Sequence, residues 1–284
     1  MKISQLYQQK AFVVSFEVFP PKKESSIDSL YQTINELGAL KPDYISVTYG
    51  AGGSESNNQT LAIAATIKAR YGIEALHHLT CIQKSKKQIT TILQAMKDQQ
   101  VKNVLALRGD LPHDAVDWDD YHLAKDLIHE IKQDTWFSAS ATCYPEGHIT
   151  QLGARENMEH LLAKQNAGAD YLISQLFFDN NVFYQLLEDC QKAGVTLPIS
   201  AGVMPILSRS QVEKMIFMCG SSLPADLIKI ISRYESDLSS LRAAGLEYAL
   251  KQMEDLQKNK VAGIHVYTMN RPEIAQASMQ LLKG

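Results

Sequence analysis

A glutamate lies within an apolar segment near the start of the chain. Glu17 stands between Phe16 and Val18, and Pro20 and Pro21 follow shortly after. Burial disfavours the charged form of a carboxyl group, and a carboxyl that stays protonated near neutral pH can act as a general acid. The segment therefore predicts a half-buried proton donor at a rigid strand end. A glutamate on the outer surface is the alternative.

A second candidate group follows an apolar run over residues 103–107. Arg108, Gly109 and Asp110 come directly after it. Gly109 would let the backbone approach a flat ligand closely, and Arg108 could pair with Asp110 or bind an anion. An ordinary turn is the alternative interpretation. The position of the three residues at the end of an apolar run favours a binding role.

A glycine-rich segment, residues 49–54, reads YGAGGS and also follows an apolar run. Backbone N–H groups of such a loop can hold a phosphate, but no lysine follows to make a nucleotide-binding P-loop. A flexible turn is an equally good interpretation. No apolar run is followed by GxGxxG, so the sequence also lacks the usual dinucleotide-binding fingerprint.

Four histidines raise the question of a metal site, and their spacing argues against one. A catalytic zinc needs three converging ligands, whereas the sequence has no HxH, HExxH or CxxC pattern. His77 and His78 are neighbours, so on a strand they would point to opposite faces, and only one could reach a barrel interior. His148 and His265 lie far apart in the chain. We expect no metal.

Composition places the chain among ordinary globular proteins. Its 284 residues include 28 Lys and Arg against 31 Asp and Glu, and the resulting net charge of −3 argues against nucleic-acid binding. Short basic runs at residues 22–23 and 84–87 are interpreted as solvated surface. No signal segment or membrane-length apolar run is present, and the four cysteines are widely spaced. We therefore expect a cytoplasmic protein without membrane contact and with reduced thiols.

The elements that must position the candidate residues recur along the chain. Apolar runs alternate with segments of helical periodicity, at intervals of 27 to 35 residues and one final interval of 66. This spacing predicts a single α/β domain, a (β/α)8 TIM barrel with extra helices between strands 7 and 8, at residues 224–232 and 237–257. A doubly wound open sheet is the alternative. The predicted strands begin near Phe12, Tyr44, Ala75, Asn103, Trp136, Tyr171, Pro198 and Ile264.

The barrel also predicts where chemistry takes place. Active sites of such barrels lie at the carboxyl ends of the strands, which is where Glu17, His78 and Asp110 fall. No strand end offers a lysine for a Schiff base, and no GxSxG nucleophile motif is present. Aromatic and hydrogen-bonding side chains without a strong nucleophile suggest that the site uses an organic cofactor. Composition and spacing do not identify that cofactor.

Taken together, the motifs resemble those of the bacterial methylenetetrahydrofolate reductases. The matching segments occur in the family's order and extend over nearly the whole chain, so the combination is far more specific than any one of them. The segments are SFEVFPP (15–21), VTYGA (47–51), HLTC (78–81), LRGDLP (107–112), YPE (144–146), AGAD (167–170), QLFFD (175–179) and YTMNR (267–271).

The resemblance implies an oxidoreductase of one-carbon metabolism that converts 5,10-methylenetetrahydrofolate to 5-methyltetrahydrofolate for methionine biosynthesis. Members hold FAD non-covalently at the carboxyl end of the barrel and use NADH or NADPH in a ping-pong reaction. We expect residues 1–284 to form one catalytic domain without the C-terminal regulatory domain of eukaryotic members. We also expect a homo-oligomer whose small-molecule partners are methylenetetrahydrofolate and NAD(P)H.

The resemblance also implies roles for individual residues. Glu17 is similar to the acid that protonates the folate, and Asp110 is similar to an aspartate near the flavin and the pterin. These two are the catalytic candidates. Positions that match flavin contacts are Thr48, His78, Arg108, Gly109, Asp110, Tyr144, His148, His160 and Lys164. Positions that match substrate contacts are Glu17, Thr48, Asp110, Gln175, Gln211, Tyr267 and Arg271.

Two other functions stay open. A flavin-dependent barrel dehydrogenase that acts on another amine, such as proline, would share the architecture but would not respond to methylenetetrahydrofolate. A non-catalytic flavin- or folate-binding protein would carry its ligand without turnover.

Overall fold

Short segments rich in β-branched and small residues form the strands of a closed parallel barrel. The computed structural model describes residues 1–21, 27–49, 54–110, 120–148 and 153–283. Within these ranges the strands pair in sequence order, and the last strand closes onto the first. The strands are β1 (Val13–Val18), β2 (Tyr44–Val47), β3 (Glu74–Thr80), β4 (Asn103–Leu107), β5 (Ser138–Cys143), β6 (Tyr171–Ser174), β7 (Ile199–Val203) and β8 (Gly263–Tyr267).

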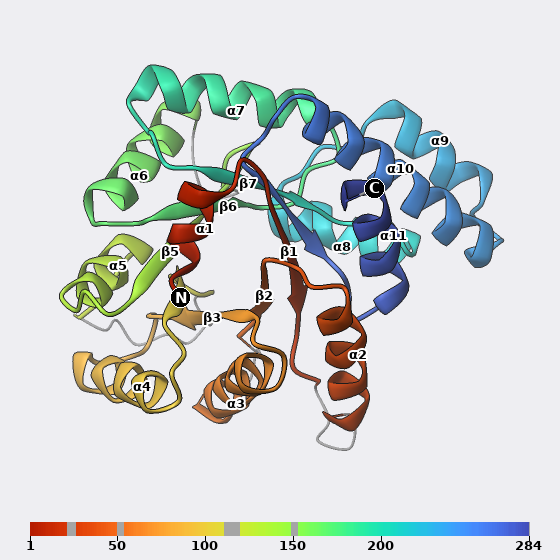
Figure 1. The fold of residues 1–284 in the computed structure, drawn as a ribbon. Coiled ribbons are helices and arrows are strands. Elements are labelled where there is room, and N and C mark those ends of the chain that lie inside the picture. Colours follow the sequence, from red (N-terminus) through yellow and green to blue (C-terminus); the bar gives the residue numbers. More distant parts are fainter. Residues whose placement is uncertain (22–26, 50–53, 111–119, 149–152, 284) are drawn as a thin grey trace.

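Helices surround the strands (Figure 1). Their apolar stripes cover the outer face of the barrel, which would otherwise expose the alternate side chains of every strand to water. The helices are α1 (Ile3–Gln9), α2 (Ile27–Ala39), α3 (Ser54–Tyr71), α4 (Lys86–Asp98), α5 (Ala124–Lys132), α6 (Ala154–Asn166), α7 (Asn180–Ala193), α8 (Arg209–Cys219), α9 (Ala225–Arg233), α10 (Leu238–Lys258) and α11 (Pro272–Lys283).

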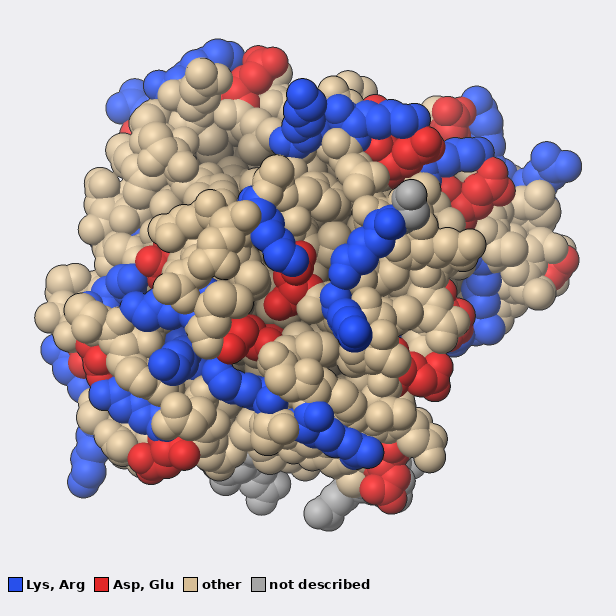
Figure 2. All heavy atoms as spheres, viewed as in Figure 1, with Lys and Arg blue, Asp and Glu red and all other residues tan. Residues whose placement is uncertain are grey.

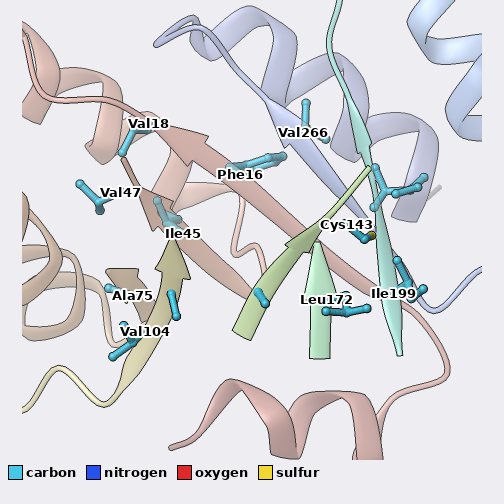
Figure 3. Packing of buried hydrophobic residues seen from close by; sticks show 14 of the residues in the cluster. Phe16, Val18, Ile45, Val47, Ala75, Val104, Cys143, Leu172, Ile199 and Val266 are labelled. Atoms are coloured by element: carbon cyan, nitrogen blue, oxygen red, sulfur yellow. The ribbon is translucent and has the colours of Figure 1, made fainter. Parts of the chain in front are cut away.

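The main hydrophobic core lies between the barrel and its helices. On β1, Phe16 and Val18 belong to this core, and on β2 Ile45 and Val47 do. Figure 3 shows these side chains together with others from the remaining strands. Because side chains alternate along a strand, the residues between them, such as Glu17, face the inside of the barrel.

The amino-terminal end of the barrel interior is closed by α1. Two apolar side chains of this helix, Ile3 and Leu6, join a separate buried cluster with inward side chains of the strands. Two polar contacts fix the start of this helix to the strands. The Ile3 N–H donates to Asn103 Oδ1 at 2.7 Å, and the terminal amine of Met1 pairs with Glu74. No pattern in the sequence predicts an element over residues 3–9. The remaining cluster members are Val13, Tyr44, Leu76, Leu105, Tyr171 and Ile173.

The barrel prediction is confirmed, and the open-sheet alternative is wrong because β8 pairs with β1. Each observed strand begins within two residues of its predicted start. The extra helices between β7 and β8 are present as α9 and α10, each displaced by one residue from the predicted range. They pack with α8 over a third apolar cluster that includes Met204 and Ile206 after β7.

Two of the sequence motifs fall partly outside the described residues. These are the glycine-rich segment, at residues 50–53, and the end of the LRGDLP motif, at residues 111–112. None of the helices in the described ranges combines the length and apolarity that a bilayer span requires. On the face shown in Figure 2, basic and acidic side chains of the described residues are interspersed.

Candidate active site

A cavity of about 790 Å³ opens at the carboxyl ends of the strands. Thr48, His78 and Thr142 line it from the ends of β2, β3 and β5, so it lies where a barrel of this type places its active site. Its volume is in the range of pockets that hold cofactor-sized molecules. All nine residues predicted to contact the flavin line this one cavity, and they are Thr48, His78, Arg108, Gly109, Asp110, Tyr144, His148, His160 and Lys164.

Cationic and imidazole side chains gather on one side of the cavity. Lys164 of α6 donates from Nζ to the Thr142 carbonyl at 2.7 Å, and burial lowers its pKa to about 8. The His148 ring lies edge-on against the Tyr144 ring at 4.8 Å, and burial followed by the charge of Arg108 lowers its pKa. An anion placed here would gain charge-assisted hydrogen bonds and would favour the protonated forms of these groups.

Gly109 occupies a backbone conformation that favours glycine, with φ +91°. A Cβ atom at this position would lie only 2.7 Å from Cγ2 of Ile82. The Arg108 side chain donates from Nε to the Gly109 carbonyl at 3.2 Å, and the exposed Asp110 follows at the cavity edge. The glycine thus allows the loop after β4 to pack close against the end of β3.

Lys84 was interpreted from the sequence as solvated surface, and this interpretation is wrong. It lines the cavity, donates from Nζ to Thr80 Oγ1 at 3.0 Å, and lies 4.9 Å from the centre of the Tyr49 ring. The other two lysines of this basic run, Lys86 and Lys87, are exposed on α4, as expected. One feature of the sequence could have distinguished Lys84 from the exposed lysines that follow it, because Lys84 lies only four residues after the end of a strand.

Glu17 lies between two imidazoles inside the barrel. Its Oε2 is 3.3 Å from His265 Nε2 and 3.6 Å from His78 Nε2, and its side chain is 16% exposed. Its position is therefore not the outer surface. The Thr268 hydroxyl donates to the Glu17 carbonyl at 2.6 Å and holds the strand end.

His78 is the neutral neighbour of Glu17. Burial lowers its pKa to about 4, an effect only partly offset by the Glu17 charge, so the imidazole is uncharged near neutral pH. Its Nε2 lies 2.6 Å from Ser46 Oγ. The prediction that only one of His77 and His78 faces inward is confirmed, since His77 shares the outward face of β3 with Ala75 and Leu79 of the main core.

The sequence offers His265 only as a possible metal ligand and gives no sign of its contact with Glu17. It is fully buried on β8, its Nδ1 lies 2.8 Å from Ser15 Oγ, and Ser15 and His265 are register partners. Alternation along β8 puts His265 and Tyr267 on one face. That alternation could have indicated that the His265 imidazole points inward. Its contact with Glu17 on β1 could not be predicted in this way, because it exists only where β8 closes onto β1.

Among the seven substrate candidates, only Thr48 and Asp110 line the cavity. Glu17 is not one of its lining residues, and the other four lie on the β6 to β8 side of the barrel. The Tyr267 hydroxyl donates to the Ser174 carbonyl at 3.0 Å. Gln175 Oε1 accepts from the Leu176 N–H at 2.9 Å. These contacts fix both side chains at strand ends.

Gln211 and Arg271 are also held by local contacts. Gln211 Oε1 accepts from the Leu207 N–H at 2.7 Å and so fixes the start of α8. Arg271 Nη1 pairs with Glu273 at 3.1 Å, directly before α11. In the described ranges, no group of three or more His, Cys, Asp or Glu residues is arranged to hold a metal ion.

Comparisons with known proteins agree with the motif resemblance. The family model described as methylenetetrahydrofolate reductase matches residues 2–283. The 5,10-methylenetetrahydrofolate reductases of Pectobacterium carotovorum subsp. carotovorum and Escherichia coli are 34% and 33% identical, over 93% of this chain and 88% of theirs. Methylenetetrahydrofolate reductase (NADH) 1 of Arabidopsis thaliana is 30% identical over 95% of this chain and 48% of its own length.

A solved structure resembles the whole barrel. It is an uncharacterized protein from Clostridium thermocellum that binds two copies of 5-methyl-5,6,7,8-tetrahydrofolic acid. The two structures have a TM-score of 0.69 at 15% identity, over 99% of this chain and 98% of the other. At this identity the likeness concerns the fold alone.

Proposed function

The chain belongs to the methylenetetrahydrofolate reductase family, and we propose that it reduces 5,10-methylenetetrahydrofolate to 5-methyltetrahydrofolate with electrons from NADH or NADPH that pass through FAD. Family membership makes it an oxidoreductase of one-carbon metabolism. The observation that carries the assignment within this chain is the Glu17 carboxyl, held between two imidazoles close to a cofactor-sized cavity.

The side chains around the cavity fit a flavin dinucleotide. FAD carries a diphosphate, and Lys164, Arg108 and His148 would supply positive charge or N–H donors to it. Burial lowers the pKa of Lys164 to about 8, and such a lysine gains most from a bound anion. When bound, FAD would take a hydride from the nicotinamide in one half-reaction and supply it to the folate in a second.

The chain's own contribution to the second half-reaction is a proton. Glu17 would donate it to N10 of the folate, the bond between N10 and the bridging methylene would break, and the N5 lone pair would form an electrophilic iminium. Both nearby imidazoles would orient the carboxyl, and His78 would do so without adding a charge, because burial keeps it neutral. Each turnover then consumes one proton from solvent.

The remaining candidates would position the ligands. We assign Asp110 to the edge shared by flavin and pterin, where a negative charge would affect folate affinity and flavin potential. Thr48 would contact both ligands. Gln175, Gln211, Tyr267 and Arg271 would contact the substrate from the β6 to β8 side. A homo-oligomeric state and a cytoplasmic location stay predictions.

The visible absorption spectrum of the purified protein tests the proposal. We expect a flavin spectrum that bleaches under anaerobic NADH or NADPH and recovers when methylenetetrahydrofolate is added. Recovery with an imine of another amine, but not with the folate, would indicate the other dehydrogenase. A flavin spectrum that no nucleotide bleaches would indicate a binding protein, and either result would overturn the assignment.

A further inference from the structure

A tight turn after β3 fixes the position of Lys84 at the active-site cavity. The Lys84 N–H donates to the Cys81 carbonyl at 3.1 Å, and within this turn Gln83 has φ +57°, in the left-handed region that favours glycine. Ser85 then caps α4, because its hydroxyl accepts from the Gln88 N–H at 3.3 Å. Lys84 is therefore held between a turn and a helix start, and the lysines that follow it are exposed on α4.

A hydroxyl group and an aromatic ring hold the Lys84 ammonium group. Its Nζ donates to Thr80 Oγ1 at 3.0 Å and lies 4.9 Å from the centre of the Tyr49 ring, and all three residues line the cavity. Neither contact neutralises the positive charge, and among the described residues no carboxylate lies within ion-pair distance of Nζ. An ammonium group has three N–H donors, and the contact with Thr80 uses only one of them.

The turn that carries Lys84 is tied to the loop that carries Arg108. The Ile82 N–H donates to the Arg108 carbonyl at 2.9 Å, which continues the pairing of β3 with β4 beyond the two strands. A Cβ atom on Gly109 would lie 3.2 Å from Thr80 Cβ, so the backbone after β4 passes close to the residue that holds Lys84. Lys84 and Arg108 therefore belong to one continuous wall of the cavity.

Basic side chains outnumber carboxylates around this cavity. Within the described part of the chain, four Lys or Arg residues line it against two carboxylates, and they are Lys84, Arg108, Lys125, Lys164, Asp110 and Glu156. The start of α5 also lines it, and a helix amino-terminus favours anions. Such an excess of positive charge favours an anionic ligand. In oxidised FAD the negative charge lies on the diphosphate, because the flavin and adenine rings are uncharged.

We propose that Lys84 binds the diphosphate of the dinucleotide cofactor from the β3 side of the cavity, while Lys164 would approach it from the β5 side. The inference rests on the proposed function, in which that cofactor is FAD. Lys84 lies outside the HLTC motif at residues 78–81, so this contact is separate from those that the motif resemblance implies. A half-buried ammonium group gains a charge-assisted hydrogen bond from a phosphate oxygen.

Lys84→Met tests the contact, and Lys87→Met is its matched control. Methionine removes the charge and keeps most of the apolar stem of the side chain. Lys87 belongs to the same basic run but is exposed on α4. Isothermal titration calorimetry of flavin-stripped protein measures Kd for FAD, for riboflavin, which has no phosphate, and for ADP, which has the diphosphate without the flavin.

Lys84→Met should weaken the binding of FAD and ADP by a similar factor of about 10- to 100-fold, because one charge-assisted hydrogen bond is lost. The riboflavin Kd should stay at the wild-type value, and Lys87→Met should change none of the three. Added salt should weaken FAD binding less in Lys84→Met than in the wild type. Lys84→Arg keeps the charge and should retain most of the FAD affinity.

Two results would overturn the contact. An equal loss of riboflavin and FAD affinity in Lys84→Met would show that the lysine shapes the flavin site, and an unchanged FAD Kd would show that it does not touch the cofactor. Urea unfolding without ligand checks that each variant keeps the fold. If ADP binds too weakly to be measured, the FAD and riboflavin values decide.

The same titrations separate this contact from the proposed function. If the wild type binds ADP but no flavin, the proposed function fails, and the effect of Lys84→Met on the ADP Kd still decides whether Lys84 holds a diphosphate. A wild type that binds neither ADP nor a flavin would overturn both.

Discussion

The Glu17 carboxyl is surrounded by groups from three strands. His265 comes from β8, His78 from β3, and the serine that contacts His78 comes from β2. Each contact joins residues far apart in sequence but adjacent in the barrel. The orientation of this carboxyl therefore depends on several neighbours, and its proposed role in proton transfer can be tested separately from hydride transfer.

Replacing Glu17 with glutamine should separate the two half-reactions. Glu17→Gln keeps the shape but cannot donate the proton, so folate reduction should fall by roughly 10²- to 10⁴-fold while flavin reduction by NADH stays near the wild-type rate. Stopped-flow absorbance measures both. The control Glu247→Gln changes an exposed carboxylate of α10 that pairs with Lys251 at 2.6 Å, and it should alter neither. Equal loss in both half-reactions would refute the acid assignment.

His78 should make stability depend on pH. Burial lowers its pKa from 6.5 to about 4, so between these values the unfolded chain binds a proton that the folded protein does not. The stabilisation is therefore complete above pH 6.5 and is lost as pH falls toward 4, on the order of 3 kcal/mol in total.

Urea unfolding at pH 7.5 and pH 5 measures this effect. His78→Gln should reduce the difference in unfolding free energy between the two pH values, because the replaced residue no longer titrates. His129→Gln, on the exposed side of α5, should retain the wild-type difference. A wild-type difference in the His78 variant would contradict the inferred protonation state.

At the scale of elements, the ends of β6, β7 and β8 approach one another unusually closely. A Cβ atom on Gly202 of β7 would lie 2.3 Å from the Ser174 carbonyl of β6 and 2.9 Å from the Tyr267 ring of β8. The Tyr267 hydroxyl donates to that same carbonyl across β7. A glycine in β7 is therefore what allows Tyr267 to lie across the strand end.

Gly202→Ala should force these strand ends apart. We expect a loss of about 1–3 kcal/mol in unfolding free energy, because the added methyl has no space, and a raised KM for the folate, because Tyr267 is displaced. Chemical denaturation and steady-state kinetics measure the two effects. Gly153→Ala, before α6, is the control, since no atom lies within 4 Å of its added Cβ. Equal stability of the two variants would show that β7 can accommodate a side chain.

At the scale of the whole molecule, a ligand bound across several strand ends should stabilise the barrel. Flavin-stripped protein should gain about 2.7 kcal/mol in unfolding free energy at an FAD concentration of one hundred times Kd. Thermal or urea unfolding with and without FAD measures this gain. Riboflavin lacks the phosphates that Lys164 and Arg108 would contact, so it should stabilise less at the same concentration.

Lys164→Met should reduce the FAD gain and leave the smaller riboflavin gain unchanged. Lys229→Met, an exposed lysine of α9 that pairs with Asp226, should change neither gain. If Lys164→Met lowers both gains equally, the lysine supports the cavity wall rather than the diphosphate.

Local patterns in the sequence determined the strands, the extra helices and the residues at the strand ends. Strand alternation and helix periodicity are properties of a few neighbouring residues, so β1 and α10 could be placed without knowing what they pack against. Glu17 and the residues around Arg108 could be selected as site candidates in the same local way, because active sites of such barrels lie at the carboxyl ends of the strands.

Only the tertiary structure decided which of these residues meet. The contact of His265 with Glu17 joins β8 to β1 and exists because the barrel closes. The closing helix α1 has too few residues to be stable alone, and it forms because Ile3 and Leu6 fill the barrel end. Lys84 likewise lines the cavity only because the loop between β3 and α4 brings it there. Such contacts depend on the register between distant segments, and no local pattern encodes that register.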